Sequence, residues 1–469
     1  MWFRRDLRLT DHPALEAAVA AARDEGGNVL AVFISDPALV KLSGVNRLRY
    51  LFACIRSLQD AGLPLVVRRG DPLHVIPELA KHLGATRVYC SADFGPYGRR
   101  RDEGVQRALA CNGTELHAVG SPYVLDPGTV RKGDGTPFKV FTPFSRVWGQ
   151  SANSHRPGPR IDPSSVAWLT TVADEGLPGH AGGQAISASL PVAGELAAAD
   201  RICTFVDNHL CAYDELRNNP SADATSRLSP DLKYGVIHPR QLLALLGNHP
   251  GEGARVFRTE LCWREFYADV LWHRPDTARE AFNTQMQGMH YDSGPVADER
   301  FWAWCMGTTG YPFIDAGMRQ LLAEGWMHNR VRMAVASFLV KDLHIDWRRG
   351  ARWFMEQLVD GDLASNQHGW QWTAGTGTDA APYFRVFNPV SQGKKFDPDG
   401  TYVKRYVPEL AGVAKKYIHE PWLDESAADS TTLFAADGPP QYVSRIVDHG
   451  EERIEALARY GAVRTEPRP

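Results

Sequence analysis

The segment Asp360 to Asn388 reads DGDLASNQHGWQWTAGTGTDAAPYFRVFN and carries two closely spaced carboxylates, two indoles, an asparagine and a Gly-rich turn. Asp362 follows Gly361, so it is placed to cap a short helix on which Asn366 and Trp370 share a face at i, i+4. Each residue alone fits a buried turn with a satisfied cap, because capping is the commonest role of an aspartate before a helix. Together they exceed what a core needs, so the segment is predicted to be functional.

Length and composition predict two or three domains. A chain of 469 residues can form more than one core. Its net charge is −3, so any DNA-binding surface must be a local basic patch. The apolar runs fall short of the roughly 20 residues that span a bilayer, and the start WFRRDLRL is unlike a signal peptide. Seven cysteines without a CxxC pair argue against a disulfide framework and favour a reducing, cytoplasmic setting.

Residues 1–125 alternate short apolar runs with helical patterns, which predicts an α/β domain with a doubly wound parallel sheet. The Val-rich runs typical of buried strands are residues 28–35, 63–70 and 86–92, and the helical patterns are residues 46–61 and 71–83. The dinucleotide motif GxGxxG is absent. Only Met1 to Phe3 remain for a first strand, so we expect the native start to lie a few residues upstream, which the intact mass of the native protein would test.

The rest of the chain is predicted to be a connector followed by a larger all-α domain. Residues 126–194 are rich in Gly, Pro and Ser, and are expected to lie over the surface and to hold no functional residues. Aromatic side chains recur in this connector at Phe138, Phe141, Phe144 and Trp148. Residues 195–469 show helical periodicity, clearest at residues 255–275 and along residues 315–347.

The segment Thr225 to Ser229, TSRLS, holds three hydroxyl groups and an arginine shortly before a helical stretch. Hydroxyls and free backbone N–H groups at a helix start can bind an anion such as a pyrophosphate. A plain capping segment explains the same residues equally well.

From WFRRDLRL at Trp2 to HEPW at His419, the sequence resembles the photolyase/cryptochrome family of flavoproteins, and is close to its bacterial class I cyclobutane pyrimidine dimer photolyases. The resemblance implies an FAD-dependent lyase: blue light excites reduced FAD, an electron passes to a pyrimidine dimer in UV-damaged DNA, the ring splits and the electron returns. The implied FAD contacts are Tyr213, Thr225, Ser226, Arg227, Leu228, Ser229, Arg264, Trp326, Asn329, Arg332, Asp360, Asp362 and Asn366.

Two of these residues bear on function. Arg332 and Asn366 are expected to donate hydrogen bonds near the flavin ring, where the reduced anionic form needs donors and positive charge, although Arg332 and Asp360 also fit a structural ion pair. The family has Asn at the position of Asn366 in photolyases, Asp in plant cryptochromes and often Cys in insect ones. This asparagine favours repair over signalling.

The resemblance also implies lesion contacts. Trp326, Asn329, Arg330 and Met333 fall at i, i+3, i+4 and i+7 of a helix predicted over residues 315–344. An amphipathic helix explains only the Trp and the Met. Relatives that repair (6-4) lesions carry a histidine pair where Asn329 and Met333 stand, so a cyclobutane dimer is preferred. The other implied lesion contacts are Glu260, Trp263 and Trp372.

Basic residues near this pocket are expected to hold DNA phosphates without reading the base sequence. Each is by default a solvated surface charge, and only their clustering favours DNA. The candidates are Arg217, Arg330, Arg385, Lys394 and Lys395.

Trp370 and Trp347 match two members of the tryptophan chain that reduces the flavin. Where relatives have a third, surface tryptophan, this sequence has HYDSGPVADERFWAW, with Tyr291 nearest the expected place and Trp302 and Trp304 close by. We therefore expect slower or rerouted photoreduction. No metal is expected, because the histidines lack ligand spacing. The residues expected to carry the reaction are Glu260, Asn329, Met333, Trp370 and Trp347.

A light-harvesting antenna is also implied. PYGRRRD at Pro96 to Asp102 resembles the 8-hydroxy-5-deazaflavin-binding form, whereas Tyr97 and Gly98 replace the Asn-Glu pair of the methenyltetrahydrofolate-binding form. Folate or no antenna are the alternatives. The candidate antenna residues are Asp36, Arg47, Asp93 and Gly98.

Three rival functions stay open. A cryptochrome-like photosensor predicts a long C-terminal extension, which the short tail TEPRP does not supply. A (6-4) photolyase and a flavoprotein without light function are the others, and the last leaves Glu260, Trp263 and Trp372 without a purpose. A monomer that binds UV-damaged DNA and no membrane is expected.

Overall fold

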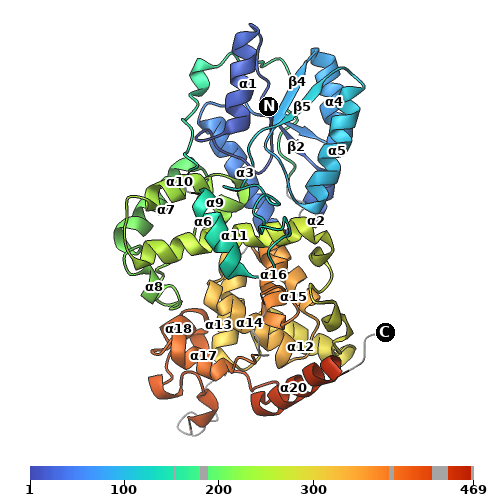
Figure 1. Cartoon of the computed structure of the whole chain (residues 1–469). Coiled ribbons are helices and arrows are strands. Elements are labelled where there is room, and N and C mark those ends of the chain that lie inside the picture. The colour runs from blue at the N-terminus through green and yellow to red at the C-terminus, as the bar shows by residue number, and fades with distance from the viewer. Residues whose placement is uncertain (153, 180–187, 380–384, 425–441, 466–469) are drawn as a thin grey trace.

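A computed structural model describes residues 1–152, 154–179, 188–379, 385–424 and 442–465. Figure 1 shows an α/β domain, formed by the N-terminal part, packed against a larger body of helices. The predicted fold class is confirmed. One part of the Asp360 to Asn388 segment, residues 380–384, lies outside the described residues, as do residues 180–187 of the connector.

All the strand pairs of the N-terminal domain are parallel. β1 pairs with β2, β2 with β3, and β4 with β5, and helices connect successive strands as in a doubly wound sheet. The predicted strands and helices of this domain are confirmed. The strands are β1 (Trp2–Phe3), β2 (Val32–Ser35), β3 (Val66–Arg69), β4 (Arg87–Cys90) and β5 (Glu115–Ala118). The helices are α1 (Pro13–Asp24), α2 (Pro37–Leu42), α3 (Val45–Asp60), α4 (Pro72–Leu83) and α5 (Pro96–Ala110).

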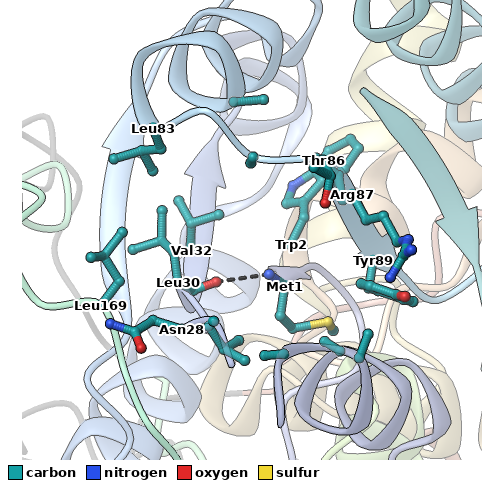
Figure 2. Close-up of a pocket in the computed structure, with 18 of the residues that line it drawn as sticks. Met1, Trp2, Asn28, Leu30, Val32, Leu83, Thr86, Arg87, Tyr89 and Leu169 are labelled. Atoms are coloured by element: carbon teal, nitrogen blue, oxygen red, sulfur yellow. Dashed lines mark hydrogen bonds between the residues drawn. The ribbon is translucent and has the colours of Figure 1, made fainter. Parts of the chain in front are cut away.

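A cavity of about 510 Å³ lies beside the short first strand. Figure 2 shows Met1 and Trp2 on one side of it, Leu30 and Val32 on another, and Tyr89 of β4 nearby. The Met1 ammonium donates to the Leu30 carbonyl oxygen at 2.7 Å, and burial lowers its pKa to about 5. No predicted site residue lines this cavity, so it is separate from the site described below.

The connector holds a helix that was not predicted. α6 (Phe141–Ala152) follows a short extended segment, and its Phe144 and Trp148 are buried, as is Phe138 ahead of it. The aromatic positions 141, 144 and 148 recur at i, i+3 and i+7, which is the spacing of one helix face. The expectation of an irregular surface segment was therefore wrong for this part, because the helix packs against α11 (Glu252–His273).

The C-terminal part consists of helices and short 3₁₀ turns in the described residues. Its helices besides α11 are α7 (Glu195–Asn208), α8 (Tyr213–Leu216), α9 (Ser229–Tyr234), α10 (Pro239–Leu246), α12 (Pro295–Met306), α13 (Pro312–Glu324), α14 (Asn329–Lys341), α15 (Trp347–Gln357), α16 (Leu363–Ala374), α17 (Pro389–Phe396), α18 (Thr401–Tyr406) and α20 (His449–Thr465). Among the described helices, none combines the length and apolar character needed to cross a bilayer.

The continuous helix predicted over residues 315–344 is wrong. α13 ends at Gly325, which adopts the left-handed conformation with φ of 61°. His328 then caps α14, its side chain accepting a hydrogen bond from the Arg330 backbone N–H at 3.2 Å. Trp326 lies in the break, so it does not share a helical stripe with Asn329 and Met333. A glycine C-cap stops a helix even where the apolar pattern continues.

The loop that follows β1 joins the two domains. The Leu7 N–H donates to the Tyr234 carbonyl oxygen at 3.1 Å, and Arg8 Nη1 donates to the Gly235 carbonyl oxygen at the same distance. The backbone N–H groups of Leu9 and Thr10 donate to the Glu195 carboxylate at 2.9 and 3.0 Å. The WFRRDLRL segment thus fixes the α/β domain against α7 and α9.

Candidate functional site

The Thr225 to Ser229 segment immediately precedes α9. Thr225 Oγ1 is buried and has no hydrogen-bond partner among the described residues. Ser229 Oγ accepts a hydrogen bond from Trp326 Nε1 at 3.2 Å. Because buried hydroxyl groups are almost always hydrogen-bonded, the lone Thr225 hydroxyl indicates a polar ligand at this position.

Arg227 of this segment is already paired. It adopts a left-handed φ of 50°, and its guanidinium contacts Asp223 at 2.8 Å and Glu324 at 2.9 Å. The same group lies 4.4 Å from the centre of the Trp326 ring. Its charge is therefore balanced by two carboxylates, and the buried Leu228 follows it.

We expect Thr225→Val to stabilise the ligand-free protein and to weaken FAD binding. Valine keeps the shape of threonine but removes a buried hydroxyl that lacks a partner, which otherwise costs about 1–3 kcal/mol. Losing one hydrogen bond to the ligand should weaken FAD binding by roughly tenfold. Denaturant unfolding of the apoprotein and FAD titration by flavin fluorescence measure the two effects.

The matched control is Thr259→Val, because the Thr259 hydroxyl donates to the Arg255 carbonyl oxygen at 3.0 Å within α11. This control should lower stability slightly and leave FAD affinity unchanged. Equal losses of stability in both variants would contradict a ligand-binding role for Thr225.

Asp362 is the N-cap of α16, as predicted, and its Oδ1 accepts a hydrogen bond from the Ser365 N–H at 3.2 Å. Its Oδ2 lies 3.2 Å from Arg5 Nη1 and 3.6 Å from Lys233 Nζ. Burial alone would raise the pKa of Asp362, but the charges of Lys233 and Arg5 outweigh it and hold the pKa well below its ordinary value. This carboxylate therefore joins α16 to both the α/β domain and α9.

Asp360 and Arg332 form the ion pair that the sequence left as an alternative. Arg332 Nη2 lies 2.8 Å from Asp360 Oδ2, and Arg332 Nε donates to the Met327 carbonyl oxygen at 2.8 Å. The other oxygen, Asp360 Oδ1, is buried without a hydrogen-bond partner in the described structure. One oxygen of Asp360 therefore serves the ion pair. The other, Oδ1, is available to accept a hydrogen bond from a ligand, for example from a ring N–H.

Asn366 lies on the buried side of α16, one turn before Trp370. Its Nδ2 donates to the Ala351 carbonyl oxygen and to Gln367 Oε1, both at 3.0 Å. The amide nitrogen is thus engaged within the protein, whereas its oxygen has no hydrogen bond among the described residues. This differs from the expected donor role: the side chain offers an acceptor.

Tyr213 and Arg264 are two further FAD candidates, and both pack against neighbouring elements. The Tyr213 ring packs edge-on against Phe205 and Phe257, with ring centres 5.4 Å apart in both pairs. Arg264 donates to the carbonyl oxygens of Pro122 at 2.9 Å and Leu232 at 3.2 Å. Arg264 therefore ties α11 to the end of the α/β domain and to α9.

On the lesion side, Glu260 and Arg217 form an ion pair of 2.6 Å, and both side chains are partly exposed. Burial raises the pKa of Glu260, although Arg217 opposes the shift. Asn329 is exposed at the first turn of α14, and Met333 follows it by one turn on the same face. These residues supply one carboxylate, one amide and one thioether.

The two predicted indole walls differ in their surroundings. One face of the Trp263 ring is covered by Phe141 of the connector, with ring centres 3.6 Å apart and planes 5° from parallel. Trp372 is half-buried at the end of α16. Phe141 therefore occupies one face of Trp263, and Phe266 and Tyr267 lie 5.7 and 5.4 Å from its ring centre. The connector, which was expected to hold no functional residue, supports this wall.

The basic candidates form one cluster with two outliers. Arg330 donates to Asn218 Oδ1 at 2.7 Å and lies 4.5 Å from the centre of the Phe396 ring. Lys395 lies 5.2 Å from the centre of the same ring. Burial and the nearby Arg217 both lower the pKa of Arg330. The outliers are Lys394, which pairs with Glu420, and the exposed Arg385.

Trp370 and Trp347 belong to one buried apolar cluster, and Tyr291 packs against it. Burial raises the pKa of Tyr291, as does the charge of Asp346, the residue before Trp347. Tyr291 is thus beside the start of α15, as the chain of electron carriers requires. The ring that contacts Trp370 edge-on, however, is Trp304, with centres 6.0 Å apart.

The antenna candidates meet at the first turn of α5. The Tyr97 hydroxyl donates to Asp36. A Cβ added to Gly98 would lie 2.2 Å from Asp93 Cγ, so no other residue fits there. Burial alone would raise the pKa of Asp93, but Arg5 and Arg101 hold it at about 2.

Arg47, the fourth antenna candidate, lies at the boundary between the α/β domain and the helical domain. Arg47 Nη2 donates to the Leu42 carbonyl oxygen at 2.9 Å, and its backbone oxygen accepts from the Tyr234 hydroxyl at 3.0 Å. Arg47 Nε is buried and has no partner among the described residues. It therefore presents an unused donor at the boundary between the two domains.

Lys233 is a charged residue of the site that the sequence did not single out. Burial lowers its pKa to about 7, although Asp362 opposes the shift and Arg5 and Arg47 add to it. It belongs to the helix that starts directly after TSRLS, and a lysine between apolar residues of so short a helix was the available signal. Lys233 and Arg5 together connect the antenna candidates to the FAD candidates.

In the part of the chain that the structure describes, no group of three or more His, Cys, Asp or Glu side chains is arranged to hold a metal ion.

Both the N-terminal and the C-terminal part of the chain match family models. A family model described as DNA photolyase matches residues 1–163, and one described as FAD binding domain of DNA photolyase matches residues 257–462. The deoxyribodipyrimidine photo-lyase of Agrobacterium fabrum is 38% identical, over 99% of this chain and 98% of that protein.

Two solved structures are similar over nearly their whole length. A bacterial class III photolyase from Agrobacterium tumefaciens has a TM-score of 0.87 at 37% identity, over 99% of this chain and 97% of the other. A cryptochrome from Synechocystis has a TM-score of 0.86 at 29% identity, over 97% and 98%. The fold thus matches a repair enzyme and a cryptochrome almost equally well.

Proposed function

The chain belongs to the photolyase/cryptochrome family, and from this premise we propose that it repairs cyclobutane pyrimidine dimers in UV-damaged DNA by blue-light-driven electron transfer, with FAD as the essential cofactor. Curated relatives that match it include deoxyribodipyrimidine photo-lyases over nearly the full chain. The enzyme is a carbon–carbon lyase in this proposal, and it acts as a monomer.

The choice between lesion repair and signalling rests on the site residues, because the overall fold is common to both. The observation that carries the proposal is the face of α14 on which Asn329 and Met333 lie one turn apart. Burial lowers the pKa of Arg330 on the same helix, and the charge of Arg217, which pairs with Glu260, lowers it further, so this ion pair lies near α14. An amide, a thioether and a carboxylate suit a neutral pyrimidine pair, which needs edge hydrogen bonds and apolar contact. Histidines for proton transfer, which the (6-4) reaction uses in relatives, are absent from these two positions.

FAD is proposed to lie between the TSRLS segment, Trp326 and α16. Thr225 Oγ1 and Asp360 Oδ1 are unpaired buried acceptors or donors that a polar cofactor would satisfy. When bound and reduced, the flavin supplies the electron that splits the dimer. The Asn366 oxygen would be the acceptor available to the bound cofactor, and the Arg332–Asp360 pair would set the charge beside it.

DNA binding follows from the lesion patch and the basic cluster. The dimer must leave the duplex to reach the pocket, which costs a few kcal/mol and least for a poorly stacked damaged site. The rings of Trp263 and Trp372 would recover stacking energy, about 1–3 kcal/mol per base. Arg217, Arg330 and Lys395 hold phosphates, so that binding is independent of base sequence.

An antenna of the 8-hydroxy-5-deazaflavin class is proposed for the α/β domain. Tyr97 and Gly98 stand where the folate-binding form has an Asn-Glu pair. The Tyr97 hydroxyl donates to the Asp36 carboxylate, and Gly98 lies close to the Asp93 carboxylate. Absorption and fluorescence of the pigment extracted from the protein would identify it, with a folate spectrum as the result against this choice.

The test of function is repair of an oligonucleotide with one thymine cyclobutane dimer by the reduced protein, in blue light and in matched darkness. Thymine should be restored only in light, and Glu260→Gln should weaken repair by roughly 10- to 100-fold, because a hydrogen bond to a charged group is lost. Glu252→Gln, on the same helix but in an exposed pair with Arg255, is the matched control and should repair normally.

A parallel oligonucleotide with one (6-4) lesion separates the alternatives. Repair of this lesion alone would assign the (6-4) reaction. Repair of neither lesion, with FAD bound and reduced, would favour a photosensor.

A further inference from the structure

We propose that Trp304 and Trp302 form an electron path from Trp370 to the protein surface, and that Trp302, not Tyr291, is its exposed end. The path serves the light-driven reduction of the flavin before repair. It rests on the proposed function in one respect only, namely that FAD binds beside Asn366. It does not depend on which lesion is repaired.

The first step joins two buried indoles. Trp370 lies one turn after Asn366 on α16 and is 3% exposed, and Trp304 on α12 is fully buried. Their ring centres are 6.0 Å apart in an edge-to-face arrangement, so the ring edges are in van der Waals contact. Trp347 shares the same core cluster, but no ring contact between Trp347 and Trp370 is found in the described residues.

The second step leads along α12 to solvent. Phe301 stacks on Trp304 with ring centres 5.9 Å apart, and on its other side it contacts Trp302 at 5.8 Å. Trp302 is 55% exposed, unusual for a tryptophan. Phenylalanine is too hard to oxidise to hold the charge, so Phe301 acts only as a bridge between two indoles. Trp353 packs against Trp302 at 5.9 Å and widens the terminal group.

The positive charge of Arg349, which lies beside the bridging Phe301 ring, is balanced by a carboxylate. The Arg349 guanidinium lies 4.2 Å from the centre of the Phe301 ring, where an isolated cation would oppose a positive charge passing by. Asp298 pairs with Arg349 at 2.8 Å and offsets it. The route is therefore not blocked by electrostatic repulsion.

The indole N–H groups explain why the charge moves outward. Trp370 Nε1 is buried and has no acceptor among the described residues, so an oxidised Trp370 cannot release its proton and stays reactive. Trp304 Nε1 donates to the Val335 carbonyl oxygen at 2.9 Å, which is too weak a base to take the proton. An exposed Trp302 can pass its proton to water, which traps the radical at the surface.

Each absorbed photon moves one electron along this path. FAD bound beside Asn366 would take that electron from Trp370, so the fully reduced form would need two such cycles, or one from the half-reduced form. Trp304 then gives one electron to Trp370, and Trp302 gives one to Trp304 across Phe301. Oxidised Trp302 loses its Nε1 proton to water, and an external thiol returns one electron and one proton to the resulting neutral radical.

Tyr291 is a poorer end point for a physical reason. Oxidation of a tyrosine requires loss of its phenol proton, and burial raises the pKa of Tyr291. Its ring packs against the core cluster that holds Trp347, half-buried beneath the surface. Trp302 has direct access to water and to an external reductant.

Transient absorption of the FAD-loaded full-length protein after a blue flash tests the path. Trp302→Phe should lower the yield of the long-lived neutral tryptophan radical, and the rate of flavin reduction with external thiol, by several-fold. Tyr291→Phe should leave both nearly unchanged. The opposite pattern, with loss in Tyr291→Phe and none in Trp302→Phe, would overturn the proposal, as would no effect in either.

Trp422→Phe is the matched control. It removes another tryptophan, 37% exposed, whose ring partner is Tyr311, and among the described residues it has no ring contact with Trp304, so this variant should behave as the parent protein. Photo-CIDNP of protein labelled with 5-fluorotryptophan provides a second readout, since polarisation should appear on the Trp302 fluorine. A polarised Trp347 fluorine instead of Trp302 would contradict the path.

Chemical reduction separates this inference from the proposed function. Trp302→Phe protein reduced by dithionite bypasses the path, so its dimer repair should equal that of the parent protein. If the chemically reduced parent protein repairs no dimer while the radical still forms on Trp302, the proposed function fails and the electron path stands.

Discussion

Asp362→Asn is expected to destabilise the protein by about 3–5 kcal/mol and to release most of its FAD, because it breaks a buried charge pair by removing one partner. The carboxylate lies 3.2 Å from Arg5 and 3.6 Å from Lys233, and the variant leaves these two cations with only a more distant counter-ion, Asp93, at 4.0 Å from Arg5. Asparagine is as good an N-cap as aspartate, so α16 keeps its first turn. The loss therefore reports charge and not capping.

Denaturant unfolding and the ratio of flavin to protein absorbance after purification measure this effect. Asp346→Asn is the matched control, since Asp346 caps α15 in the same way and pairs with Arg348 nearer the surface. It should cost less than about 1 kcal/mol. The double variant Asp362→Asn with Lys233→Met should recover part of the loss. Similar losses in both single variants would contradict the central place given to Asp362.

Lys233→Met is expected to remove a pH dependence of stability. Burial lowers the pKa of Lys233 from about 10.5 to about 7, so between these values the unfolded chain binds the proton and the folded protein does not. Stability therefore rises as pH increases from about 7 to about 10.5, by up to about 1.4 kcal/mol per pH unit for one lysine. As pH falls from about 10.5 to about 7 this stability is lost, and below about 7 this group adds no further change.

Unfolding free energies of the apoprotein at several pH values from 7 to 10 measure the slope. Lys341 has a similarly lowered pKa of about 7, also through burial, so the variant should reduce the slope without abolishing it. Lys132→Met, at an exposed position of the connector, should leave the slope unchanged. A slope identical in Lys233→Met and the parent protein would show that Lys233 is not desolvated in the folded state.

The fold class and the individual elements of the α/β domain follow from local patterns. The Val-rich runs form β2, β3 and β4, and the helical spacings form α3 and α4, because side-chain periodicity alone selects the element that can bury one face. The cap at Asp362 and the shared face of Asn366 and Trp370 are likewise local, since they depend on residues within two turns of each other.

Tertiary structure decided what the patterns could not. The apolar pattern of residues 315–344 continues through Gly325, yet the helix ends there. Gly325 in the left-handed conformation caps the end of α13, and His328 caps the start of α14. The connector places Phe141 against Trp263, and α12 places Trp304 against Trp370. Neither contact has a signature in the spacing of the residues involved.

The sequence by itself therefore determined the two domains, the family and most candidate residues of the site, because each depends on residue type or on neighbours along the chain. Only the tertiary structure decided which of those residues share a charge, a ring contact or a proton. Arg5 and Asp362 stand 357 positions apart and form one ion pair. A contact of that span arises when two finished domains bury their surfaces together, and no local preference of the chain encodes it.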